Sequence, residues 1–165
     1  KKVSDFTADI IIATYNKLIE NEYPANKVVL GGFNNYSRYA GPKEAVFTAL
    51  CRKNFGCSHF IVGRDHTGVG SFYPTDAAKR LFVELGDIGI QPIFFDEVYY
   101  CTKCNKYVEK CMHGLDKNSR ISGSEVRNKL QKGESLPDWF IRESVLKQIN
   151  EEIKNGHPVL YKEGI

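Results

Sequence analysis

The fold of this chain is decided by the stretch His59-Phe60-Ile61-Val62-Gly63, which runs directly into the loop Arg64-Asp65-His66-Thr67-Gly68-Val69-Gly70. A short apolar run that ends at a glycine is typical of a buried strand in a parallel sheet. Open α/β sheets bind their ligands in the crevice beyond the carboxyl ends of such strands. We therefore expect residues 59–63 to form a strand and the glycine-rich loop after it to lie at a ligand site.

The segments on both sides of this strand alternate between extended and helical patterns. Residues 27–33 and 89–95 are also short apolar runs that contain glycine, so two further buried strands are expected there. Apolar residues at helical spacing predict helices over residues 4–21, 42–55 and 75–85. Strands that alternate with helices over short connections predict a parallel sheet covered by helices, which is the α/β class.

Capping residues indicate where two of the helices begin. Ser4 or Asp5 is placed to cap the first helix. Ser122 and Glu125 have the spacing of a capping box, which predicts a helix that begins at that point. A last helix is expected over residues 141–154.

Metal-ligating side chains gather just after residue 100, where the pattern of the sequence changes. Their spacing is Cys-x2-Cys-x6-Cys-x-His, formed by Cys101, Cys104, Cys111 and His113. The chain has five cysteines, an odd number that does not suit a closed disulfide set. Four complete ligands suit a structural, tetrahedral zinc; free cysteines in a loop are the alternative. We divide the chain into an α/β part, residues 1–100, and a zinc knuckle with a helical subdomain, residues 101–165.

Two segments have the chemistry of anion sites. In the loop 63–68, glycines allow close backbone approach, Arg64 offers a planar set of donors and His66 offers another donor; an ordinary glycine-rich turn is the alternative. The second segment, Ser122-Gly123-Ser124, begins a predicted helix and is followed one turn later by Arg127; a plain helix cap is the alternative there. The two segments together suggest a polyphosphate that lies between them.

The composition describes an ordinary globular chain. Its 165 residues are 42% hydrophobic and 26% charged, which fits one domain, or one with a small appendage. A net charge of +3 is too mild to indicate nucleic acid or a membrane as a partner. No apolar run approaches the ~20 residues of a spanning helix and no secretory signal is recognised, so we expect a cytoplasmic protein. Because the chain opens with Lys1-Lys2 and holds one methionine, Met112, we expect a fragment.

Two blocks of the sequence resemble the sulfate adenylyltransferase (ATP sulfurylase) family. They are Arg38-Tyr39-Ala40-Gly41-Pro42-Lys43-Glu44-Ala45 and residues 52–66. The block 121–127 and the cysteine knuckle resemble the bacterial and archaeal, zinc-containing branch. The resemblance covers essentially the whole chain and matches the C-terminal part of the full-length enzyme. It implies part of a Rossmann-like nucleotidyltransferase (HUP-type) sheet with a small, zinc-fastened helical subdomain.

The resemblance also implies an activity and a set of site residues. Members of the family join ATP, which carries magnesium, to sulfate and yield adenosine 5′-phosphosulfate and pyrophosphate. A homo-oligomer is compatible with the sequence. Thr67 occupies the position whose backbone N–H helps to hold sulfate. The residues carried over to the ATP site are Gly63, Arg64, Asp65, His66, Val98, Ser122, Ser124 and Arg127.

This sequence also departs from the family pattern. Thr67 stands where the family usually has alanine, and Thr48 where it has histidine. The segment Gln/Thr-x-Arg-Asn-Pro-x-His-x-x-His, which supplies the sulfate-binding arginine and two transition-state histidines, is absent from these residues. We therefore expect no catalytic residue and little activity in the chain alone. There are two alternatives: a diverged nucleotide-binding module with another acceptor, and a non-catalytic, zinc-stabilised interaction domain. The interaction domain would not bind ATP or phosphosulfate, whereas the other two hypotheses predict that the chain binds nucleotide.

Overall fold

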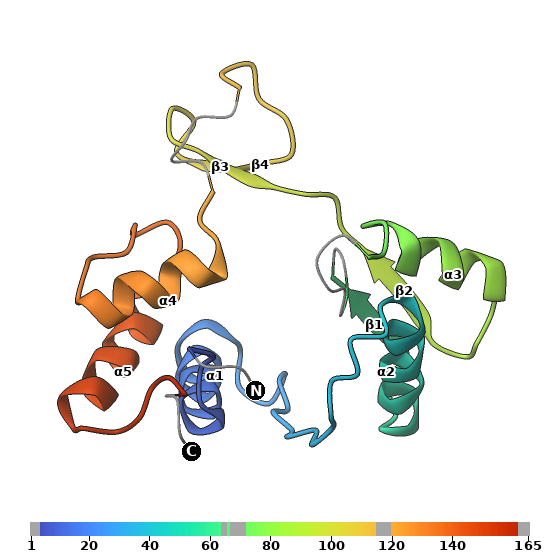
Figure 1. The fold of residues 1–165 in the computed structure, drawn as a ribbon, viewed down its shortest axis with the longest axis horizontal. Helices are drawn as coiled ribbons and strands as arrows, with labels where there is room; N and C mark the ends of the chain where they lie inside the picture. Colours follow the sequence, from blue (N-terminus) through green and yellow to red (C-terminus); the bar gives the residue numbers. More distant parts are fainter. Residues whose placement is uncertain (1–3, 64–65, 67–71, 115–119, 162–165) are drawn as a thin grey trace. The chain divides into compact units, whose positions relative to one another are not determined.

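The computed structural model describes residues 4–63, 66, 72–114 and 120–161. Contacts divide the chain into two compact units. The first unit comprises Lys1–Phe33, Tyr100–Lys106 and His113–Ile165, and the second comprises Asn34–Tyr99 and Tyr107–Met112. Within the described ranges, no helix is both long and apolar enough to cross a membrane. The helices and strands are α1 (Ala8–Glu22), α2 (Pro42–Asn54), β1 (His59–Val62), α3 (Ala77–Leu85), β2 (Gln91–Phe94), β3 (Tyr99–Cys101), β4 (Lys106–Val108), α4 (Gly123–Lys132) and α5 (Glu143–Lys154) (Figure 1).

The second unit is built around the parallel pair of strands β1 and β2. Their register joins His59 to Gln91 and Val62 to Phe94, and α3 forms the crossover between them (Figure 1). The α/β class and the parallel sheet are therefore confirmed. Apolar side chains from α2, β1, α3 and the residue before β2 form one buried cluster, which contains Ala45, Ala49, Val62, Ala78, Phe82 and Ile90.

The strand expected over residues 27–33 does not form, so that prediction was wrong. No strand is assigned to this run, and the side chain of Val29 is 95% exposed. A strand needs a neighbour that satisfies its backbone N–H and C=O groups. Among the described residues β1 and β2 pair only with each other, and residues 27–33 fall in the first unit. An apolar pattern alone does not supply the partner strand.

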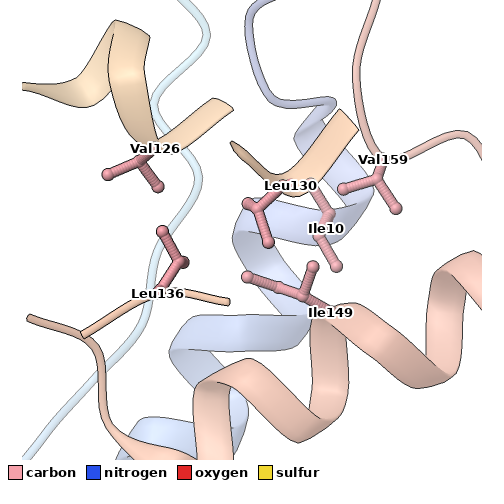
Figure 2. Packing of buried hydrophobic residues seen from close by; sticks show 6 residues of the cluster. All are labelled: Ile10, Val126, Leu130, Leu136, Ile149 and Val159. Atoms are coloured by element: carbon pink, nitrogen blue, oxygen red, sulfur yellow. The ribbon is translucent and has the colours of Figure 1, made fainter. Parts of the chain in front are cut away.

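The first unit gathers α1, α4 and α5 around an apolar core. Figure 2 shows how side chains from these helices and from the adjoining segments point toward one another. α1 also packs along α5. The buried members of the cluster are Ile10, Val126, Leu130, Leu136, Ile149 and Val159.

The start of α1 differs from the predicted one. Thr7, rather than Ser4 or Asp5, is the N-cap, and its side chain accepts a hydrogen bond from the backbone N–H of Ile10. The same hydroxyl donates to the carbonyl oxygen of Pro158 at 2.9 Å. Thr7 is buried, so this cap also joins the beginning of the unit to its end. The predicted cap of α4 is confirmed, because Ser122 Oγ accepts from the N–H of Glu125.

The packing of α5 gives a stability prediction. We expect Ile149→Ala to lower the free energy of unfolding by about 2–5 kcal/mol, since it removes buried methyl groups and leaves a cavity. Ile153→Ala is the matched control on the same helix, because Ile153 is 46% exposed; its cost should be about 0.5 kcal/mol. Denaturant unfolding followed by circular dichroism measures both values. Equal losses in the two variants would show that α5 does not use this face for packing.

Candidate functional site

A cleft lies at the carboxyl ends of β1 and β2. Because the strands are parallel, both end at the same edge of the sheet, and ligands of open α/β sheets bind at this edge. The cleft has a volume of about 390 Å³. Its lining comes from the ends of both strands, the segments that follow them and the start of α3, and consists of Val62, Gly63, Thr75, Asp76, Ala78, Lys79, Phe94, Phe95, Asp96 and Glu97. Gly63 therefore stands in the crevice where the sequence analysis expected a ligand site.

The walls of the cleft combine charged groups with aromatic surface. Lys79 Nζ lies 5.9 Å from the ring centroid of Phe94, and Asp76 pairs with Arg80 at 3.0 Å. Carboxylates accept hydrogen bonds from hydroxyl groups, and an ammonium group attracts phosphate oxygens. The arrangement suits a ligand that carries both hydroxyl and anionic groups.

Four charged cleft residues were missed by the sequence analysis. Asp96 and Glu97 stand two and three residues after the end of β2, the same spacing that the two residues after Gly63 have from the end of β1. That position was a usable signal, because the residues after parallel neighbouring strands meet at one edge. Asp76 and Lys79 carry no such signal, since only the packing of α3 directs them to the cleft.

His66 is half-buried, and its ring meets that of Phe60 edge-on with centroids 5.7 Å apart. Burial lowers the pKa of His66, and the negative charge of Glu44 acts against this lowering. Burial therefore favours the neutral imidazole, in which one nitrogen donates and the other accepts a hydrogen bond. The other predicted residues of this loop, Arg64, Asp65 and Thr67, lie outside the described residues.

Val98 follows Glu97 but is not among the residues that line the cleft. Its side chain is 50% exposed. Val98 is therefore next to a cleft residue in sequence but is not part of the cleft wall.

The second predicted anion segment stands at the start of α4, in the first unit. Ser122 caps the helix, and Arg127 Nη2 donates to Ser124 Oγ at 3.1 Å. Ser124 and Arg127 are therefore brought together. Gly63 and His66 belong to the second unit.

The four expected metal ligands come together around the β3–β4 hairpin. All four ligand atoms lie within 4.8 Å of one another. His113 Nδ1 is 3.7 Å from Cys101 Sγ and 3.4 Å from Cys104 Sγ, and the N–H of Cys104 donates to Cys101 Sγ. A tetrahedral zinc with ordinary bond lengths separates nitrogen and sulfur ligands by about 3.6 Å. The donor set and its spacing fit a tetrahedral metal ion.

These features define an α/β protein with a ligand cleft at its parallel sheet and a Cys3His cluster that can hold a metal. A model of the ATP-sulfurylase family matches residues 1–152, and the chain belongs to that family. The sulfate adenylyltransferase of Staphylothermus marinus is 46% identical over 90% of this chain, that of Cenarchaeum symbiosum 40% over 92%, and that of the bacterium Symbiobacterium thermophilum 41% over 93%. The chain spans about 40% of the length of each of these relatives.

A solved structure gives a likeness at the level of the fold. It is titled a hexameric APS kinase from Thiobacillus denitrificans and has a TM-score of 0.57 over 88% of this chain and 28% of that one. The sequences are 20% identical, so the likeness concerns the fold alone.

The cysteine cluster gives a second prediction. We expect protein prepared without added metal to hold about one transition-metal ion per chain, and Cys101→Ser to lose most of it because a hydroxyl is a poor substitute for thiolate. Cys57→Ser is the control, since Cys57 is an exposed free cysteine outside the cluster. Elemental analysis and a thiol titration provide the measurement. A metal-free, fully folded chain would contradict the expectation.

Proposed function

We propose that this chain is the C-terminal part of a sulfate adenylyltransferase, which joins ATP and sulfate to give adenosine 5′-phosphosulfate and pyrophosphate. One observation carries the proposal: Gly63, the first residue of the run Gly63-Arg64-Asp65-His66, lines the cleft at the carboxyl ends of the parallel strands. Membership of the ATP-sulfurylase family supports it. The relatives that bear the name sulfate adenylyltransferase support it as well.

The reaction needs positioning and charge stabilisation more than covalent help from the protein. A sulfate oxygen attacks the α-phosphorus of ATP in line, and pyrophosphate leaves from the opposite side. Donors that face the developing charge lower the barrier. We assign Gly63, Arg64, Asp65 and His66 to the ATP contacts and the backbone N–H of Thr67 to sulfate. A neutral His66 can donate one hydrogen bond to a phosphate oxygen.

The second phosphate-contacting group in this proposal is the start of α4. Unpaired N–H groups at a helix N-terminus favour an anion. The hydrogen bond from Arg127 to Ser124 holds the guanidinium at that end of the helix. We assign Ser122, Ser124 and Arg127 to the phosphates, and Val98 to the adenine side. The sheet is then part of a HUP-type nucleotidyltransferase domain, with residues 1–100 as its α/β part.

The metal in this proposal is a structural zinc held by the Cys3His cluster, and magnesium enters with ATP. Three thiolates and an imidazole are a ligand set that zinc prefers. Four protein ligands leave no open position for a substrate. Bound zinc would stabilise the hairpin in residues 101–165, and clustered thiols of this kind suit a cytoplasmic enzyme.

A diverged module with another oxyanion acceptor is the second candidate. Thr67 and Thr48 favour it, because they replace the alanine and histidine of the family pattern. Replacing sulfate with other tetrahedral oxyanions in the assay below distinguishes the two.

The third prediction concerns the chain alone. Pyrophosphate release from these 165 residues, with magnesium-ATP and sulfate, should stay at background. The segment with the sulfate-binding arginine and two histidines is absent from them, and single donors of this kind contribute about 100- to 1,000-fold each. A full-length relative serves as the positive control. Turnover near about 1 per second in the chain alone would mean that other residues had replaced the segment.

The fourth prediction concerns Arg64 in an enzyme that contains the missing segment. We expect Arg64→Ala to cost about 2–4 kcal/mol of transition-state stabilisation, since it removes a charged donor at developing charge. Arg142→Ala is the control, because Arg142 pairs with Glu22 at the surface. Steady-state kinetics give the ratio of kcat/KM values. Unchanged turnover and ATP affinity would assign Arg64 a structural role.

A further inference from the structure

Glu44 is a buried carboxylate that the proposed reaction does not use. It lies in the first turn of α2 and is 5% exposed. Thr7 is the other buried polar residue in the described part of the chain, and its hydroxyl caps a helix. A buried carboxylate is costly unless hydrogen bonds compensate for the lost water. The partners of Glu44 therefore indicate what it does.

Both carboxylate oxygens of Glu44 accept backbone hydrogen bonds from the segment before the helix. Oε1 accepts from the N–H of Arg38 at 3.0 Å, and Oε2 accepts from Arg38 at 3.2 Å and from Ala40 at 3.0 Å. Tyr39, between these donors, has a φ of 53°, a left-handed conformation that is uncommon for a bulky residue. Such backbone persists where surrounding contacts hold it, and the carboxylate makes these contacts.

The same turn is fixed from its other side by Tyr73. Gly41 has a φ of 53°, and a Cβ at this position would lie 2.4 Å from Tyr73 Cδ2. Only glycine allows this ring to lie so close to the backbone. The guanidinium of Arg38 lies 5.3 Å from the centroid of Phe47, which adds a contact to α2. The segment 38–41 is thus held in one conformation at the start of α2.

The first turn of α2 is joined to His66 through shared packing on Phe60. Ala45, the residue after Glu44, is fully buried in the cluster against which Phe60 packs. The ring of His66 rests edge-on against Phe60. The charge of Glu44 acts on the imidazole, raising the pKa that burial lowers.

We propose that Glu44 is a positioning residue of the nucleotide site, because its carboxylate fixes the 38–41 turn at the helix start that also supports the packing of His66. The identity of the site as a nucleotide site rests on the proposed function. The link between Glu44 and His66 does not depend on the proposed function, because it is argued from packing within the second unit.

The first experiment follows the His66 imidazole by NMR titration. In Glu44→Gln the negative charge that raises the pKa of His66 is lost, so the midpoint of the His66 titration should move to lower pH. Glu84→Gln is the control, with the same charge change at an exposed site on α3 of the same unit. Arg64 and Asp65, adjacent to His66 in sequence, are unchanged in both. An identical His66 midpoint in the parent chain and Glu44→Gln overturns the proposal.

The second experiment separates the turn from the charge. Tyr39→Gly adopts a positive φ freely, so the loss of melting temperature caused by Glu44→Gln should be smaller in the Tyr39→Gly background. Additive losses would contradict the role of Glu44 in holding the turn. The double variant also provides a folded protein for the titration if Glu44→Gln alone unfolds.

The third measurement tests the functional side by calorimetric titration with magnesium-ATP. We expect Glu44→Gln to bind about tenfold more weakly than the parent chain, and Glu84→Gln to bind equally well. Equal affinity in all three chains would overturn the positioning role. If the parent chain itself does not bind ATP, the proposed function fails, while the His66 titration still decides whether Glu44 and His66 are linked.

Discussion

The parallel pairing of β1 with β2 is the interaction on which the second unit depends. Its register makes both strands end at one edge, so the segments after Val62 and after Phe94 contribute to one cleft. An antiparallel pair would send these segments to opposite ends of the sheet. Parallel strands also require a crossover, and α3 supplies both this connection and part of the cleft wall, through Asp76 and Lys79.

Apolar burial stabilises the first unit. Its helices bury apolar side chains against one another, as Ile10, Leu130 and Ile149 do (Figure 2). The β3–β4 hairpin has strands of three residues each, too short to be stable without further support. Ligands from both sides of this hairpin meet in the Cys3His cluster. A metal bound there would connect segments that apolar burial alone would not hold.

Local features of the fold could be predicted from the sequence, and features that depend on distant partners could not. The helix between Gly41 and Gly56 and the cap at Ser122 follow from neighbouring residues, and both were found. The metal cluster could also be predicted from the sequence, because its ligands lie within thirteen residues, 101–113. The run 27–33 has a strand-like pattern, but whether it pairs depends on another part of the chain.

Two site features needed the three-dimensional structure for a similar reason. Glu44 looks in sequence like one more acidic residue in a first helical turn, and its partners are backbone N–H groups that any residue type carries. Lys79 reaches the cleft only through the packing of α3. Side-chain type and spacing carry no information about either arrangement.

The bond between Thr7 and Pro158 joins residues 151 positions apart, and an antiparallel bridge pairs Phe6 with Leu160 beside it. Both ends of the described chain thus belong to the first unit, and most of the second unit is an insertion into it. During synthesis from the N-terminus, residues 34–99 can complete their own core while α1 still waits for its partner. The first unit closes only after Pro158 has been made, so of these two units the one that begins earlier in the given sequence is the one that finishes folding later.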